Sequence, residues 1–195
     1  MTMANKVTIC RILLVPFFFV AVIYYVKTGV EFYRWFAISC FGVAAISDGI
    51  DGFIARHFNQ WSELGTVLDP LADKLLLVSG ILLLSWHNEP YLRPIPVWLT
   101  VTVLSRDVIL LFGYAVIHFL AGGMSVKPLL ISKAATVLQM AAVLWTLFKF
   151  DAHAHYWICV VAAVLTGLSG IIYIFAGMRL LAKHPSSSAT KKGKP

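Results

Sequence analysis

The chain has 195 residues, of which 59% are hydrophobic and 13% charged, and its mean hydropathy is +0.83. Soluble domains carry about 45–50% apolar and roughly 25% charged residues, so this composition excludes an ordinary soluble domain and a disordered chain. Six helices of about 20 apolar residues would take roughly 120 residues and leave only short loops and tails. We therefore expect one all-helical membrane domain with six transmembrane helices.

A net charge of +7, from 16 Lys and Arg against 9 Asp and Glu, is the second feature of the composition. In a soluble protein this excess would favour nucleic-acid binding. In a membrane protein it is typical of basic flanks beside the anionic cytoplasmic leaflet, so we expect membrane lipids and no nucleic acid as partners. Three cysteines without CxxC spacing predict neither a disulfide framework nor a zinc site.

Six apolar segments follow one another along the chain, and they cover residues 12–25, 34–56, 69–86, 95–120, 129–148 and 156–182. We interpret each segment as one transmembrane helix, so that the membrane domain spans residues 1–182. Residues 183–195 combine four lysines with Ser, Gly and Pro. They are expected to form a disordered basic tail.

The positions of the cations predict the orientation in the membrane. With the N-terminus inside, the inner flanks hold nine Lys and Arg residues and the outer loops hold four, namely Lys27, Arg34, Arg93 and Lys149. The positive side of a membrane protein faces the cytoplasm. We therefore expect an integral protein of the inner (cytoplasmic) membrane with both termini in the cytoplasm.

Five of the nine acidic residues interrupt apolar sequence, which is unusual because a carboxylate at membrane depth is costly unless it is paired or solvated. Four of them, Asp48, Asp51, Asp69 and Asp73, lie within 26 residues, at the end of one expected span and the start of the next. A hairpin at the cytoplasmic end of the membrane would bring them together. The fifth, Asp107, adjoins Arg106, where an orienting role and a functional role are equally open.

Helical geometry places each pair of acids on one helix face, because Asp48 and Asp51 are three residues apart and Asp69 and Asp73 four apart. Four facing carboxylates repel one another unless a divalent cation with oxygen ligands lies between them. The cluster contains no His or Cys, which favours Mg²⁺ or Mn²⁺ over zinc. The alternative is a set of buried ion pairs, for which the available cations are Arg56, Lys74, Arg106 and Lys133.

Small residues and one arginine accompany the acids. Gly52 and Ala55 leave a groove on the carboxylate face, Arg56 offers a fork of donors for a phosphate, and Gly65 permits close approach of the backbone. Together the residues form one string: Asp48-x2-Asp51-Gly52-x2-Ala55-Arg56-x8-Gly65-x3-Asp69-x3-Asp73. This string resembles the complete signature of the CDP-alcohol phosphatidyltransferase family. The flank Asn5-x2-Thr8-x2-Arg11 agrees with it, and the resemblance extends over the whole chain.

The resemblance implies a six-span bundle that transfers a phosphatidyl group from CDP-diacylglycerol to an alcohol and releases CMP. It also implies that Asp48, Asp51 and Asp69 ligate one or two Mg²⁺ or Mn²⁺ ions and that Asp73 joins them when two are bound. Asp73 would be the base that takes the proton of the attacking hydroxyl. The CDP site would consist of Gly52, Ala55, Arg56 and Gly65. The active site would face the cytoplasm, and family members of this kind are expected to be homodimers.

The acceptor alcohol is less well defined. Three cations near the cytoplasmic half of the last three spans, Arg106, Lys133 and Arg179, are candidates for a pocket that binds an anionic acceptor, although ordinary flank charge is the alternative for Arg179. A phosphate-bearing acceptor fits best, which favours the branch of the family that uses glycerol 3-phosphate. Residues 105–107 and 127–133 resemble instead the branch that forms cardiolipin from phosphatidylglycerol. Inositol phosphate and serine are less favoured.

Two hypotheses come from other classes. A divalent-cation transporter would also place acids in the membrane, but transporters tend to show paired, interrupted helices in two halves, and here there is one acid cluster. A non-catalytic scaffold would leave the acids unexplained. His153-x-His155 lacks the further ligands of a zinc site and is interpreted as part of a polar loop.

Overall fold

The computed structural model describes the backbone of residues 3–58, 63–86, 88–121 and 130–182. Within these ranges it describes all side chains except those of residues 3–9, 48–58, 63–73, 114, 116–121 and 180–182. The expected basic tail, residues 183–195, lies outside the described residues.

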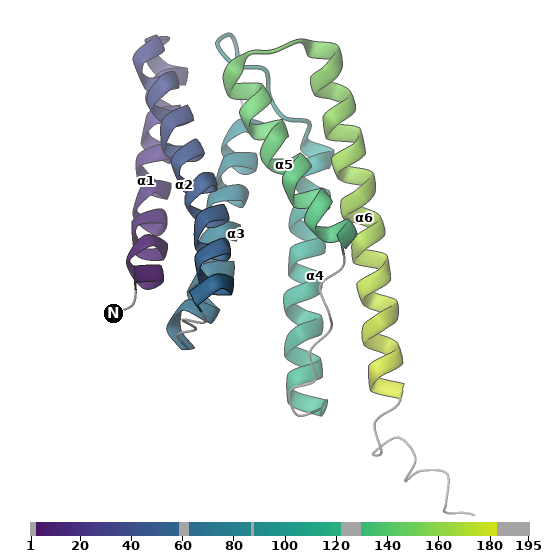
Figure 1. Cartoon of the computed structure of the whole chain (residues 1–195). Coiled ribbons are helices and arrows are strands. Elements are labelled where there is room, and N and C mark those ends of the chain that lie inside the picture. The colour runs from purple at the N-terminus through teal and green to yellow at the C-terminus, as the bar shows by residue number, and fades with distance from the viewer. Residues whose placement is uncertain (1–2, 59–62, 87, 122–129, 183–195) are drawn as a thin grey trace, which may run out of the picture. The chain divides into compact units, whose positions relative to one another are not determined.

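The described residues form six helices and no strand (Figure 1). They are α1 (Met3–Thr28), α2 (Glu31–Phe58), α3 (Glu63–Ser85), α4 (Val97–Ala121), α5 (Leu130–Phe148) and α6 (Ala152–Ala182). Each helix matches one of the six apolar segments, and where a segment extends beyond its helix it does so by one or two residues, so the all-helical prediction is confirmed. Among the described residues, three stretches are long and apolar enough to cross a membrane: Cys10–Thr28, Leu130–Phe148 and Ala152–Arg179. A count of six spans stays a prediction.

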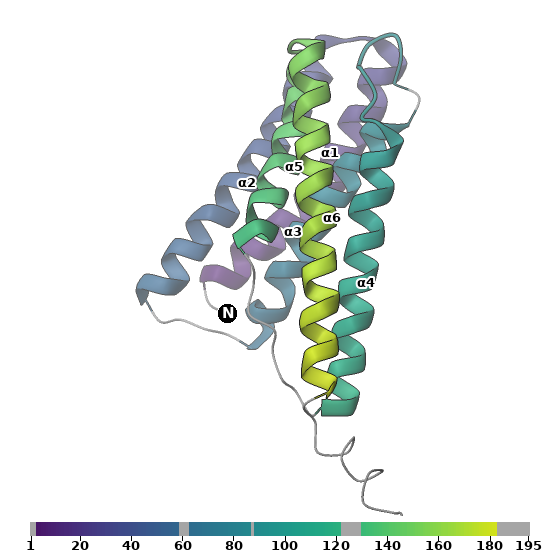
Figure 2. The same cartoon turned by 90° about the vertical axis from the view of Figure 1, so that its right-hand side faces the viewer.

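The chain divides into two compact units, which are described separately. The first unit comprises residues 1–96 and 139–156. In it α1 packs against α2 and α3, as both views show (Figures 1 and 2). Phe18 and Phe41 are fully buried, with ring centroids 5.6 Å apart. A Cβ at Gly80 would lie 3.4 Å from Phe41 and from Val143, so this glycine allows α3 to approach its neighbours closely.

A tight turn joins α1 to α2. Its Gly29 has φ +69°, and the Gly29 N–H donates a 2.8 Å hydrogen bond to the Tyr25 carbonyl. A Cβ at this position would lie 2.5 Å from the Tyr91 ring. Both the left-handed backbone and the approach of Tyr91 therefore require glycine.

The turn from α5 to α6 uses a different solution. Lys149 takes the left-handed conformation, with φ 58°, just after the last residue of α5. The carboxylate of Asp151 then caps α6, because its Oδ2 accepts hydrogen bonds from His153 N and Ala154 N at 2.9 and 3.1 Å. These bonds, that from Ala154 first, hold the pKa of Asp151 below its usual range. His153 and His155 both lie inside α6, the first exposed and the second buried, so the interpretation of this pair as part of a polar loop is wrong.

The second unit comprises residues 97–138 and 157–195, in which α4 and α6 lie side by side in both views (Figures 1 and 2). A Cβ at Gly170 of α6 would lie 3.4 Å from Arg106 Cγ of α4. Large apolar side chains of α4 remain highly exposed, including Leu111 at 68% and Phe112 at 73%. Such a surface is not tolerated in water over a large area, whereas it suits contact with lipid.

Candidate active site

The four signature acids lie on two regular helices. Asp48 and Asp51 belong to the C-terminal part of α2, and Asp69 and Asp73 to the N-terminal half of α3. The backbone is helical at all four positions, so the three- and four-residue spacings do correspond to shared helix faces. Their side chains lie outside those described, as do the side chains of the proposed CDP-binding residues Gly52, Ala55, Arg56 and Gly65.

The two acid-bearing helix ends belong to the same end of a helix pair. Only residues 59–62 separate α2 from α3, and so short a link reaches at most about 18 Å when fully extended. The two helices also contact one another, and both contact α1. The expected hairpin is therefore present in the backbone.

Helix α1 carries a buried arginine in the flank that precedes the signature. Arg11 is 1% exposed, although the sequence analysis placed it among the cations that flank the expected spans. A buried guanidinium is costly without partners, and Arg11 does interact with other groups. The only signal in the sequence is its place in the Asn5-x2-Thr8-x2-Arg11 flank, since a count of charges cannot show burial.

In the second unit, Arg106 is the centre of a buried polar cluster. Its Nη1 lies 2.7 Å from Asp107 Oδ1, and its Nη2 donates to the hydroxyl oxygen of Ser132. Arg106 and Asp107 are each 8% exposed. The Nε of Arg106 is buried and has no hydrogen-bond partner within the part of the chain that the structure describes. Asp107 thus orients Arg106, while one N–H of the guanidinium is still available as a donor.

The other two candidate acceptor residues lie at different distances from this cluster. Lys133 directly follows Ser132 in the first turn of α5, and its side chain is exposed. Arg179 is exposed in the last turn of α6, nine residues beyond Gly170, which corresponds to about 13 Å along the helix axis. The structure therefore brings Ser132, and with it the backbone of Lys133, to Arg106. No described contact joins Arg179 to either residue.

No group of three or more His, Cys, Asp or Glu side chains gathers among those that the structure describes. The predicted metal ligands are outside that set, so the metal site stays a prediction. What the structure contributes is the regular helical backbone beneath the carboxylates.

Comparison with known proteins places these features in context. The family model of CDP-alcohol phosphatidyltransferases matches residues 1–168. The CDP-diacylglycerol–glycerol-3-phosphate 3-phosphatidyltransferase of Escherichia coli K12 is 34% identical over 172 residues, which cover 87% of this chain and 91% of that protein. The proteins of the same name from Shigella flexneri serotype 5b and Shigella sonnei match with the same identity and coverage.

Proposed function

Because the chain belongs to the CDP-alcohol phosphatidyltransferase family, we propose that it is a phosphatidylglycerophosphate synthase. It would transfer the phosphatidyl group of CDP-diacylglycerol to glycerol 3-phosphate and release CMP. The observation that carries the choice of acceptor is the 34% identity, over most of both chains, to enzymes named for this reaction. The buried Arg106, with a spare donor, supports an acceptor that bears a phosphate.

The family uses a divalent metal, and the donor set of this chain fits one. Carboxylates at helical spacing on two adjoining helix ends are the oxygen ligands that Mg²⁺ or Mn²⁺ prefers. Asp48, Asp51 and Asp69 would hold one ion, and Asp73 would join them for a second. Bound there, the metal would neutralise the diphosphate and stabilise the departing phosphate of CMP.

The chain's own residues would carry the remaining chemistry. Asp73 takes the proton of the acceptor hydroxyl, and the oxygen attacks the phosphorus that bears diacylglycerol. A new phosphorus–oxygen bond forms to the acceptor as the bond to CMP breaks. Arg56 binds the diphosphate, while Gly52, Ala55 and Gly65 leave room for the nucleotide.

The acceptor pocket centres on Arg106. Asp107 and Ser132 hold two nitrogens of its guanidinium in place, which reduces the entropy lost when a phosphate binds. Lys133 adds a second positive charge close by. Arg179 would contribute at longer range, at the end of α6.

The rest of the proposal concerns the surroundings of the enzyme. We place it in the inner (cytoplasmic) membrane as a homodimer, with the active site and both termini facing the cytoplasm. A site at that surface would let CDP-diacylglycerol keep its acyl chains in lipid while a soluble acceptor enters from water.

A cardiolipin synthase that uses phosphatidylglycerol is the second candidate, since residues 105–107 and 127–133 resemble that branch. Its acceptor is a phosphodiester lipid and lacks a terminal phosphate. A divalent-cation transporter no longer competes, because the chain belongs to a family of transferases.

The test uses purified protein with CDP-diacylglycerol and Mg²⁺ and follows the release of CMP. Glycerol 3-phosphate and phosphatidylglycerol are supplied in separate reactions. We expect release with glycerol 3-phosphate alone, and a loss of about 10²–10⁴-fold in Asp73→Asn because the general base is removed. Glu89→Gln, which changes an exposed acid far from the signature in the sequence, is the control. Release only with phosphatidylglycerol, or an unchanged rate in Asp73→Asn, would contradict the proposal.

A further inference from the structure

The first unit contains a cavity of about 170 Å³ away from the proposed active site. Two cations and a histidine line it, Arg93, Lys149 and His155, together with the aromatic residues Tyr91, Trp145 and Phe150. We propose that this cavity binds the phosphate of an anionic phospholipid headgroup, in the leaflet opposite to the one that holds the acid signature.

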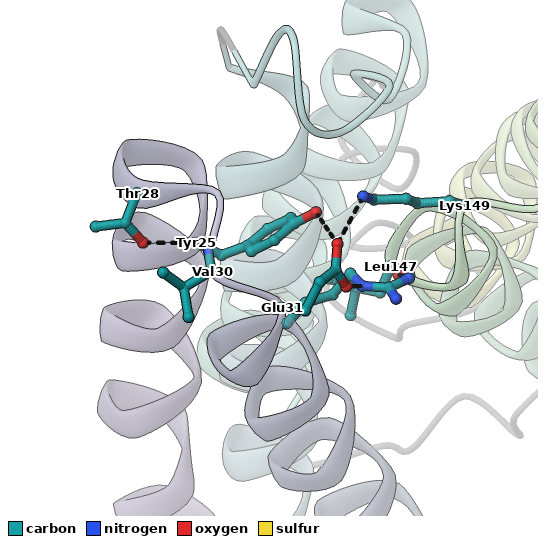
Figure 3. A network of polar contacts seen from close by, with 7 residues as sticks. Tyr25, Thr28, Val30, Glu31, Leu147 and Lys149 are labelled. Atoms are coloured by element: carbon teal, nitrogen blue, oxygen red, sulfur yellow. Dashed lines mark hydrogen bonds and ion pairs between the residues drawn. The ribbon is translucent and has the colours of Figure 1, made fainter.

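The cavity lies at the helix ends opposite to the acids. Lys149 Nζ is 3.1 Å from Glu31 Oε1, at the first residue of α2 (Figure 3). Asp48 comes 17 residues later on the same helix, which corresponds to about 26 Å along its axis. That distance approaches the thickness of the hydrocarbon core, so the cavity and the proposed active site face different leaflets.

The charged side chains that line the cavity are cationic. No carboxylate lines it, but the neighbouring Glu31 pairs with Lys149, one of the two lining cations. Glu31 serves both Lys149 and Arg34, the latter through a 2.5 Å contact with Arg34 Nε. Asp151 caps α6. Arg93 is exposed and makes no ion pair with another described residue, so its charge is available to an anion.

Two polar residues of the lining, His155 and Thr146, are hydrogen-bonded to one another. His155 Nε2 lies 3.0 Å from Thr146 Oγ1, and the Thr146 hydroxyl donates to the Ala142 carbonyl at 3.1 Å. Since the hydroxyl has one proton, His155 Nε2 is the donor to Thr146. The imidazole is therefore fixed in orientation, and a fixed wall lowers the entropic cost of binding.

The aromatic lining favours a lipid over a free phosphate ion. Trp145 Nε1 donates to the Asp151 carbonyl at 3.1 Å, and its ring packs edge-on against Phe150 with centroids 4.9 Å apart. Phe150 and Tyr91 are 53% and 38% exposed. Aromatic side chains at helix ends are typical of the headgroup region of a bilayer. A phosphate bound here would leave its acyl chains beside exposed apolar rings.

The experiment measures binding to the purified full-length protein in a non-ionic detergent. The probes are short-chain phosphatidylglycerol, short-chain phosphatidylcholine and inorganic phosphate. Arg93→Gln is compared with Lys27→Gln, which removes an equal charge from the same helix ends but outside the cavity. Any binding of lipid at the active site contributes equally to both variants.

We expect Arg93→Gln to weaken phosphatidylglycerol binding about tenfold or more, as the loss of a hydrogen bond from a charged group predicts. Lys27→Gln should leave it unchanged, Arg93→Lys should retain most of it, and phosphatidylcholine should bind more weakly. Thermal melting of each variant confirms that it is folded. Equal effects of the two glutamine variants, or equal affinity for phosphatidylcholine, would overturn the proposal. Inorganic phosphate binding as tightly as the lipid would overturn the assignment to a lipid.

Discussion

Two clusters of charged residues differ in how completely their hydrogen-bonding groups find partners. In the second unit, Arg106 and Asp107 are buried, and Arg106 retains an N–H without a partner among the described residues. In the first unit, Glu31 is exposed, and hydrogen bonds from Lys149, Arg34 and Tyr25 satisfy it (Figure 3). Those contacts, that with Lys149 first, hold the pKa of Glu31 below its usual range.

The difference indicates different roles. An exposed ion cluster with all its partners in place contributes little to stability and joins helix ends: Arg34 also donates to the Leu147 carbonyl at 3.2 Å. A buried guanidinium with a spare donor is costly to leave without a partner. The presence of this guanidinium is explained if an anionic ligand accepts a hydrogen bond from its remaining N–H. Substitutions in the two clusters should therefore affect different measurements.

Among substitutions in and around the two clusters, the largest effect is expected for Arg106→Gln. Loss of a charged hydrogen-bond donor to the acceptor phosphate is worth about 1.5–3 kcal/mol, so the KM for glycerol 3-phosphate should rise roughly 10- to 100-fold. The KM for CDP-diacylglycerol should change little, and Arg106→Lys should restore part of the loss. Steady-state CMP release with each substrate varied in turn provides the measurement. Equal increases in both KM values would indicate a structural role only.

The next effect concerns the turn that positions Glu31. Gly29→Ala forces a Cβ into the left-handed region, which costs about 1–2 kcal/mol, and into contact with the Tyr91 ring. The thermal midpoint of the detergent-solubilised protein should fall. Gly42→Ala is the matched control, because its Cβ meets nothing within 4 Å and alanine favours a helix interior. Equal midpoints for the two variants would show that the turn does not depend on glycine.

A smaller effect is expected where α6 supports Arg106. Gly170→Ala places a Cβ 3.4 Å from Arg106 Cγ, so the arginine must shift slightly. We expect the KM for glycerol 3-phosphate to rise a few-fold at nearly unchanged stability. Gly167→Ala, where a Cβ meets nothing within 4 Å, should behave as wild type. A similar KM for glycerol 3-phosphate in both variants would indicate that the position of Arg106 does not affect acceptor binding.

The smallest effect is a dependence of stability on pH. The folded-state pKa values of Glu31 and Asp151 lie below their usual values of 4.5 and 3.8. Their contribution is therefore complete above those values and is lost as the pH falls through the folded-state pKa values. Thermal melting should show a slight loss of stability below about pH 4.5, reduced in Glu31→Gln. A loss that begins near neutral pH would point to other groups.

The sequence predicts much of the helical framework, because long apolar runs in a membrane have few alternatives to the helix. It also places Asp107 beside Arg106, where the structure finds an ion pair. The burial of Arg11 and of His155 was not predictable, since both depend on packing against other helices, α2 and α3 around α1 and α5 beside His155. The left-handed conformation of Lys149 was not predictable either, because the residue that adopts it is not glycine.

The proposed site also has one part that the sequence predicts and one part that it does not. The signature is a local pattern on two consecutive helices, so its spacing can be interpreted directly from the sequence. The environment of Arg106 arises instead from Ser132 and Gly170, which lie 26 and 64 residues away. No periodicity connects them. The cavity beside Arg93 likewise joins residues from two separate turns.

The most direct test of the account is the mass of the lipid that the purified enzyme makes from CDP-diacylglycerol with Mg²⁺, when glycerol 3-phosphate and phosphatidylglycerol are present together. We expect phosphatidylglycerophosphate, with its terminal phosphate, formed in equal amount to CMP. Cardiolipin as the main product would contradict it and would assign the acceptor site to a lipid.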